Sequence, residues 1–236
     1  MQKVTSKDGT TIAFDKAPSA SSETTTKMTR ALLACGVVAG PMYLSVGLVQ
    51  AFTRSGFDIT RHALSLLSNG DLGWIQITNF LVTGLMVIAG AVGMRRALRS
   101  GRGRTLVPLL VGVYGLGLIG AGIFKADPAM GFPIGTPADA TAISSNGLLH
   151  FVCGGVGFLA LIAACFVMAR RFATLHQSGW AAYSVVTGVV FFAGFFGIAS
   201  GSGNGWTLLG FWIGLVLAWA WVSAVSARLR GESGTM

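Results

Sequence analysis

Residues 172–227 read FATLHQSGWAAYSVVTGVVFFAGFFGIASGSGNGWTLLGFWIGLVLAWAWVSAVSA and contain no Asp, Glu, Lys or Arg. A helix needs about 20 apolar residues to cross a bilayer, so this stretch is long enough for two spans. The polar cluster SGSGNG at 200–205 separates predicted spans at 179–199 and 206–227. Charge-free stretches upstream predict four more, at 31–53, 73–94, 105–124 and 146–168. We therefore expect an all-α protein, a bundle of six transmembrane helices.

The composition of the whole chain agrees with a bilayer protein. Hydrophobic residues make up 53% and charged residues only 11%, against about 25% charged in ordinary soluble domains. The 3 cysteines are too few for a disulfide scaffold, and we expect them to be buried reduced thiols. The sequence predicts a membrane domain at 31–228, a polar and disordered tail at 1–30, and a short tail at 229–236.

The orientation follows from the basic residues, because Lys and Arg accumulate in cytoplasmic connections. Fourteen of the 17 basic residues lie in the two tails and in the loops after the second and fourth spans. The opposite side holds only Arg54, Arg61 and Lys125. We expect both termini in the cytoplasm and the chain in the plasma membrane. This topogenic role explains the formal charge of +9, so we expect membrane lipids as partners and no nucleic acid.

The first outer segment, SGFDITRHALSLLSNGDLGW at 55–74, is too long for a plain turn and too polar to span. A helix beginning at Asp58 would place apolar side chains on one face and Arg61, His62 and Ser65 on the other. We expect a short interfacial helix that ends at Asn69-Gly70. The alternatives for Arg61 and His62 are surface contacts with Asp58 or a role in binding an anionic headgroup or in acid–base chemistry.

Polar side chains recur at helical spacing in the outer halves of the spans, as Gln76, Asn79 and Thr83 do. Such side chains should face the interior, because hydrocarbon offers them no hydrogen-bond partner. His150 is an ionisable residue inside the fourth span, and its alternatives are a functional group or a neutral histidine satisfied by Gln76 or Asn79. Asp127 is followed by proline, which is typical of a turn and also compatible with a functional acid. The candidates for catalysis are His150, Asp127 and His62, and those for ligand binding are Arg61, Ser65, Asp71, Gln76, Asn79 and Asn146.

An ordered set of short motifs resembles a known family. The set comprises R-H-x-x-S-x-L-x-x-G-x-x-G-W-x-Q-x-x-N-F at 61–80, F-K-x-D-P at 124–128 and G-L-L-H at 147–150. It resembles the DUF998 family of prokaryotic integral membrane proteins over about residues 31–228. The resemblance implies a six-helix membrane protein and assigns no catalytic residue.

The first sixteen residues resemble the opening β-hairpin of α/β-hydrolases, with a turn at Asp8-Gly9. No G-x-S-x-G motif follows, so we expect no hydrolase domain. Zinc, Walker and dinucleotide motifs are also absent from the sequence, and we predict no cofactor and no resident metal. The one metal arrangement that the sequence leaves open is a site of His62, His150 and the carboxylate of Asp127 or Asp71.

Three classes of function stay open at this level. The first is binding or modification of a lipid or amphipathic small molecule in a cavity near the outer leaflet, which the polar stripes favour. The second is a small-molecule transporter or permease. The third is a membrane scaffold that packs against another membrane protein or a second copy of itself. Whether the chain is an enzyme is not decided by its sequence.

Overall fold

The computed structural model describes residues 2–5, 11–14, 20–101, 103–140, 142–200 and 205–234. Within these residues, six helices are long and apolar enough to cross a membrane, as the sequence predicts. They differ from the predicted spans mainly at the ends, where several continue past the apolar stretch. The helices are α1 (Ala20–Thr53), α2 (Gly73–Ala97), α3 (Leu106–Ile123), α4 (Ser145–Thr174), α5 (Ser178–Ala199) and α6 (Gly205–Glu232).

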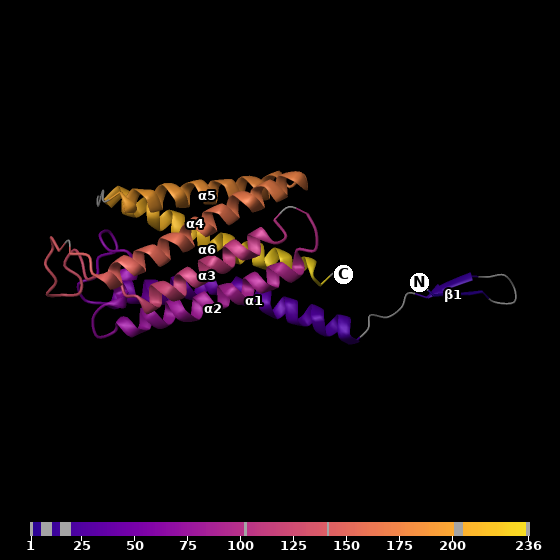
Figure 1. Ribbon diagram of the computed structural model, residues 1–236, viewed down its shortest axis with the longest axis horizontal. Coiled ribbons are helices and arrows are strands. Elements are labelled where there is room, and N and C mark those ends of the chain that lie inside the picture. Colours follow the sequence, from indigo (N-terminus) through magenta and orange to yellow (C-terminus); the bar gives the residue numbers. More distant parts are fainter. Residues whose placement is uncertain are drawn as a thin grey trace.

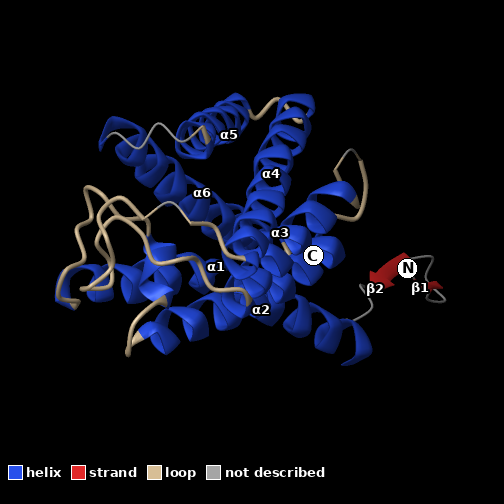
Figure 2. Cartoon of the chain, turned by 60° about the vertical axis from the view of Figure 1, so that its left-hand side comes forward, coloured by secondary structure: helices blue, strands red, loops and turns tan. Residues whose placement is uncertain are grey.

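The six helices form a ring in sequence order. Each helix packs against the next one along the chain, and α1 packs against α6 to close the ring. Figure 1 shows the helices side by side along the long axis of the molecule. The connections 54–72 and 124–144 lie together at one end, which we call the loop end (Figure 2). The other end, here the terminal end, carries the start of α1, the 98–105 connection and the C-terminus.

The centre of the ring is filled by aromatic side chains from three helices. The Tyr43 ring of α1 stacks on Trp219 of α6 at a centroid distance of 4.7 Å. The ring of Tyr114 in α3 lies 5.4 Å from the same indole. Tyr43, Tyr114 and Trp219 are all buried, and we call these three side chains the aromatic plug.

Five of the six helix–helix interfaces bring a glycine against the backbone of the neighbouring helix. At Gly117 of α3, an added Cβ would lie 2.7 Å from the carbonyl oxygen of Cys153 in α4. Such a distance is too short for a real Cβ, so the helices approach this closely only where a side chain is missing. The equivalent glycines at the other four interfaces are Gly40 (α1–α6), Gly84 (α2–α3), Gly90 (α1–α2) and Gly194 (α5–α6).

The interface between α4 and α5 is different, because its glycines meet side chains and not backbone. A Cβ at Gly155 would lie 3.3 Å from the Phe195 ring, and one at Gly188 would lie 3.1 Å from the Phe166 ring. These rings can change rotamer, whereas a helix backbone cannot. The ring of helices is therefore tightly fixed on five sides and held by side chains on the sixth.

The N-terminal segment contains a two-stranded antiparallel hairpin, β1 (Gln2–Thr5) and β2 (Thr11–Phe14). Gln2 pairs with Phe14, and Thr5 pairs with Thr11. The predicted Asp8-Gly9 turn lies outside the described residues. Helix α1 begins at Ala20, inside the segment predicted as a polar tail, and an ion pair of 2.6 Å between Lys27 and Glu23 joins its first turns.

The first loop departs from the predicted amphipathic helix. The chain forms a turn at Asp58, where the carboxylate accepts hydrogen bonds from the Thr60 hydroxyl (2.7 Å) and backbone N–H (2.8 Å). A short 3₁₀ helix, η1 (Leu64–Ser68), follows. Leu64, Leu66 and Leu67 are all buried in the bundle. Because three leucines so close in sequence turn inward together, the segment folds into the loop end, a conformation that helical periodicity does not describe.

Candidate functional site

A small cavity of about 110 Å³ lies inside the loop-end half of the ring, and we call it the axial cavity. Five of the six helices and the start of η1 line it, and only α2 does not contribute. Tyr43 of the aromatic plug is one of its walls. The lining residues are Tyr43, Ala63, Leu64, Ser65, Leu118, Ala121, His150, Phe151, Gly154, Gly155, Phe158, Phe195, Ile198, Phe211 and Leu215.

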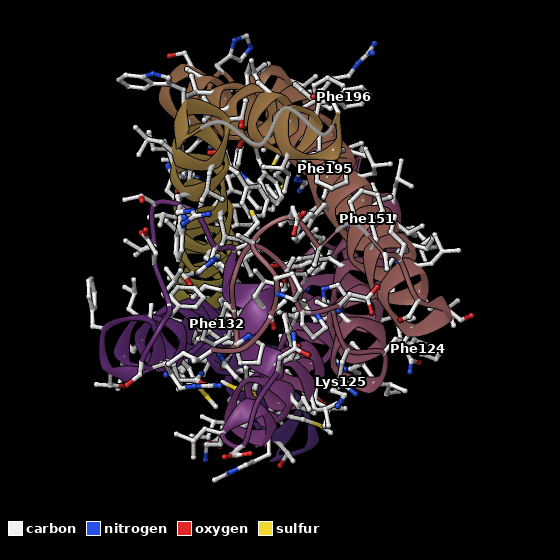
Figure 3. The ribbon with its side chains drawn as sticks, turned by 90° about the vertical axis from the view of Figure 1, so that its left-hand side faces the viewer. Phe124, Lys125, Phe132, Phe151, Phe195 and Phe196 are labelled. Atoms are coloured by element: carbon white, nitrogen blue, oxygen red, sulfur yellow. The ribbon has the colours of Figure 1, made fainter. Side chains whose placement is uncertain are left out.

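The walls on the α4–α6 side are aromatic. The Phe158 ring lies 5.4 Å from Phe195 of α5 and 5.8 Å from Phe211 of α6, measured between centroids. Phe151 stacks on Phe195 at 6.2 Å, and Figure 3 shows these two rings close together at the loop end. Phe151 is exposed at the surface of the bundle. The cavity is thus an apolar space next to the α4–α5 interface, suited to hydrocarbon and poorly suited to ions.

His150 is the one basic side chain in this lining, and its tautomer is defined. Its Nδ1 atom lies 2.9 Å from the carbonyl oxygen of Ala121 and 2.8 Å from that of Phe124. Both oxygens can only accept, so Nδ1 carries the proton and donates to the last turn of α3. Nε2 has no hydrogen-bond partner among the described residues. A neutral His150 therefore has a free acceptor nitrogen, and the residue lines the axial cavity.

Unlike His150, His62 has no free ring nitrogen. The His62 side chain is buried, its Nδ1 accepts the backbone N–H of Asp58 at 2.9 Å, and its Nε2 lies 3.0 Å from the carbonyl oxygen of Met130. Nε2 must therefore donate, and both ring nitrogens are occupied. The ring also packs against both Phe57 and Phe132, which contact each other. His62 joins the first loop to the second loop at the loop end.

Asp127 is held at the start of α4. Its carboxylate accepts hydrogen bonds from the Ser144 backbone N–H (2.7 Å) and hydroxyl (2.5 Å). The same hydroxyl accepts the Gly147 N–H at 3.1 Å and caps the helix. A carboxylate at this position is favoured by the positive end of the helix dipole. Asp127 thus fixes the second loop to α4, the helix that carries His150.

Arg54 organises the first loop in a way that the sequence did not indicate. Its guanidinium donates to the carbonyl oxygens of Leu67 (3.0 Å) and Asn69 (2.6 Å) and lies over the Phe132 ring at 5.2 Å. Partial burial lowers the pKa of Arg54 below its ordinary value, and nearby Asp71 opposes the shift.

The remaining predicted ligand-binding residues are not gathered at one place. Ser65 lines the axial cavity, whereas Arg61, Asp71 and Asn146 are exposed at the loop end. Gln76 and Asn79 are buried but do not line the cavity.

The buried amides bind α1 to α2. Gln50 Nε2 donates to Gln76 Oε1 at 2.9 Å, and Asn79 Nδ2 donates to the Tyr43 carbonyl oxygen at 3.1 Å. Gln76 Nε2 and Asn79 Oδ1 are buried and have no partner among the described residues. The predicted polar stripe of α2 therefore faces the interior, next to the aromatic plug. Sequence reasoning missed Phe158, Phe195 and Phe211 as cavity residues. An apolar side chain in a span can face either the interior or the lipid, and the sequence does not distinguish the two.

The described residues contain no group of three His, Cys, Asp or Glu side chains that could hold a metal ion. The site of two histidines and one carboxylate does not form, because both nitrogens of His62 are engaged with backbone groups.

Comparison with known proteins identifies one family. A family model described as "Protein of unknown function (DUF998)" matches residues 37–228. No curated protein and no solved structure matches the chain.

Proposed function

The chain belongs to the DUF998 family, whose description assigns no activity, and we propose that its axial cavity binds the apolar chain of a lipid or another amphipathic small molecule. The observation that supports this most directly is the cavity lining, which is mostly aliphatic and aromatic and includes His150, a residue with one free ring nitrogen. The volume of about 110 Å³ is below the ~300–1,000 Å³ of drug-sized pockets. It suits the end of one chain and excludes a bulky ligand.

The polar end of the ligand is constrained by His150. Its Nδ1–H is occupied by the carbonyl oxygens of Ala121 and Phe124, so a ligand meets the Nε2 lone pair. That lone pair accepts a hydrogen bond. We expect the ligand to carry a hydroxyl or another donor near its apolar chain.

Binding is favoured over both catalysis and transport. The other two candidates for catalysis, Asp127 and His62, are engaged at the loop end in structural hydrogen bonds. The buried rings of Tyr43, Tyr114 and Trp219 pack together next to the cavity, an arrangement that favours a closed binding site over a channel.

Photo-crosslinking of the full chain in nanodiscs tests the proposal. The probe is an analogue of hexadecanol that carries a diazirine in its alkyl chain, and the labelled residues are identified by peptide mass spectrometry. Leu215 lines the cavity and is 3% exposed, so bilayer lipid cannot reach it. We expect labelling at Leu215. Labels confined to exposed residues would refute the proposal.

Two glycines provide matched variants. Gly154 lines the cavity and has open space at its Cβ position, so Gly154→Leu fills the cavity without a backbone clash. Gly210 also has open space at that position but is not a lining residue. We expect Gly154→Leu to abolish labelling of Leu215 and Gly210→Leu to leave it unchanged.

A third variant examines His150. Asn in place of His150 keeps an N–H donor for the α3 carbonyl oxygens and removes Nε2. In the wild type, hexadecanol should compete with the probe better than its methyl ether does, because only the alcohol donates a hydrogen bond. His150→Asn should remove this preference. An equal preference in both proteins would exclude His150 from recognition.

A further inference from the structure

A second, larger cavity lies at the opposite end of the bundle and is independent of the axial cavity. It has a volume of about 470 Å³. The first turns of α1, the last turn of α2, the 98–105 connection and Ser233 near the C-terminus surround it. We call it the arginine cavity, because four of its lining residues are Arg95, Arg96, Arg99 and Arg104.

The four guanidinium groups have no acidic partner in the described part of the chain. No hydrogen bond or ion pair joins the side chain of Arg95, Arg96, Arg99 or Arg104 to another described residue. Two acidic residues are described at this end, and both are paired with cations outside the cavity. Glu23 binds Lys27 at 2.6 Å, and Glu232 binds Arg228 at 2.9 Å.

Membrane topology accounts for the number of these arginines but not for their convergence. The rule for cytoplasmic loops depends on how many Lys and Arg they hold, not on whether the side chains share a cavity. Arg95 and Arg96 lie in the last turn of α2, where the helix dipole favours a cation. Arg104 lies just before α3, where the dipole disfavours one. A bound anion would offset both this effect and the mutual repulsion.

The described residues next to Arg99 and Arg104 are anchored to the bundle. Arg171 of α4 donates from Nη1 to the Ser100 carbonyl oxygen at 2.6 Å. Leu98 is buried, and Gly101 and Gly103 both have φ of +83°, which favours glycine. The arginines therefore project from an anchored loop.

We propose that the arginine cavity binds a phosphate-bearing anion of at least two negative charges. Guanidinium groups bind phosphate oxygens in bidentate fashion, and basic pockets between membrane helices accept phosphorylated headgroups. Thr25 and Thr29 add hydroxyl groups to the same lining. The anion is either a phosphomonoester lipid headgroup or a soluble diphosphate, since both offer the same oxygen atoms.

The experiment separates these two sources in the full chain. In one arm, nanodiscs of phosphatidylcholine receive inorganic pyrophosphate; in the other, they contain phosphatidic acid and no soluble phosphate. Thermal unfolding is followed in both. A saturable rise in Tm with pyrophosphate assigns the cavity to a soluble anion, and a rise with phosphatidic acid alone assigns it to a lipid headgroup. No rise in either arm overturns the proposal.

Paired variants test the location. Arg99→Gln with Arg104→Gln should weaken the binding about tenfold or more for each lost guanidinium, because a hydrogen bond to a charged group contributes about 1.5–3 kcal/mol. Arg170→Gln with Arg230→Gln removes the same charge from exposed positions outside the cavity. Equal losses in the two double variants would show that only the total charge matters and would refute the site.

Discussion

Replacement of Gly117 by Ala tests the packing that holds α3 against α4. The added Cβ would lie 2.7 Å from the Cys153 carbonyl oxygen and 2.8 Å from the Gly157 Cα. Both are backbone atoms, so the two helices must separate. Overpacking of this kind costs about 1–3 kcal/mol. Ala also gains about 1 kcal/mol of helix propensity over Gly, which offsets part of that cost.

Gly112 of the same helix supplies the control. Its Cβ would have one neighbour within 4 Å, the Ala91 Cβ at 3.9 Å, which is an ordinary contact. Gly112→Ala therefore gains the propensity without the clash. We expect the two variants to differ in unfolding free energy by about 1–3 kcal/mol, with Gly117→Ala the less stable.

The difference is measurable as a shift in the midpoint of thermal unfolding, followed by circular dichroism in one detergent for wild type and both variants. Gly117→Ala should unfold at a lower temperature than wild type, and Gly112→Ala at the same or a higher temperature. Equal midpoints for the two variants would show that α3 and α4 do not approach this closely, and the reasoning for the other glycine interfaces would fail with it.

Three further predictions concern the loop end. Asp127→Ala should lower the stability by about 1–2 kcal/mol through loss of the bonds to Ser144, measured by thermal unfolding, whereas an effect no larger than that of exposed Asp139→Ala would contradict it. His62→Ala loses two hydrogen bonds of a buried side chain and the packing against two phenylalanines, at a cost of about 2–4 kcal/mol. Limited proteolysis should then cleave the first loop faster than in the wild type. An unchanged rate would refute the role of His62 in joining the first loop to the second. Hydrogen bonds from the Thr60 hydroxyl and N–H hold the pKa of Asp58 below its ordinary value. The carboxylate therefore stabilises the turn fully at a pH above the ordinary pKa of aspartate, and this stabilisation is lost as the pH falls through the lowered pKa of the folded protein. Hydrogen exchange of the Thr60 amide should accelerate in that acidic window in wild type, and identical profiles for wild type and Asp58→Asn would count against the carboxylate.

The sequence is informative about the fold because the bilayer imposes its own length scale. A charge-free run of about 20 residues has few alternatives to a spanning helix, and the six expected helices are found as α1–α6. The glycines of the third span were interpreted as packing residues, and Gly117 does meet the backbone of α4. Gly112 does not, because it lies on a different face of the same helix. Which glycines of such a run are in contact depends on helix rotation, which the run itself does not encode.

The site was less predictable, because its contacts join distant backbone atoms. His150 was identified as an ionisable group inside a span, and it lies in the axial cavity. Its partners, however, are carbonyl oxygens of α3 and not the amides of Gln76 or Asn79. His62 similarly binds Met130, which is 68 residues away. Every residue carries a backbone carbonyl, so the residue types in the sequence do not indicate which carbonyl oxygen a histidine will contact.

The unequal interfaces of the ring bear on how a ligand reaches the axial cavity. A molecule that enters from the bilayer must separate two neighbouring helices, and at five interfaces this would break backbone contacts at a glycine. At the α4–α5 interface it needs only rotamer changes of rings such as Phe195, which packs on exposed Phe151 beside the cavity (Figure 3). Side-chain rotations occur on far shorter timescales than collective helix motions. For a ligand of the proposed kind, we therefore expect lateral entry between α4 and α5 to need the least reorganisation, and this path leads to the side of the cavity that carries His150.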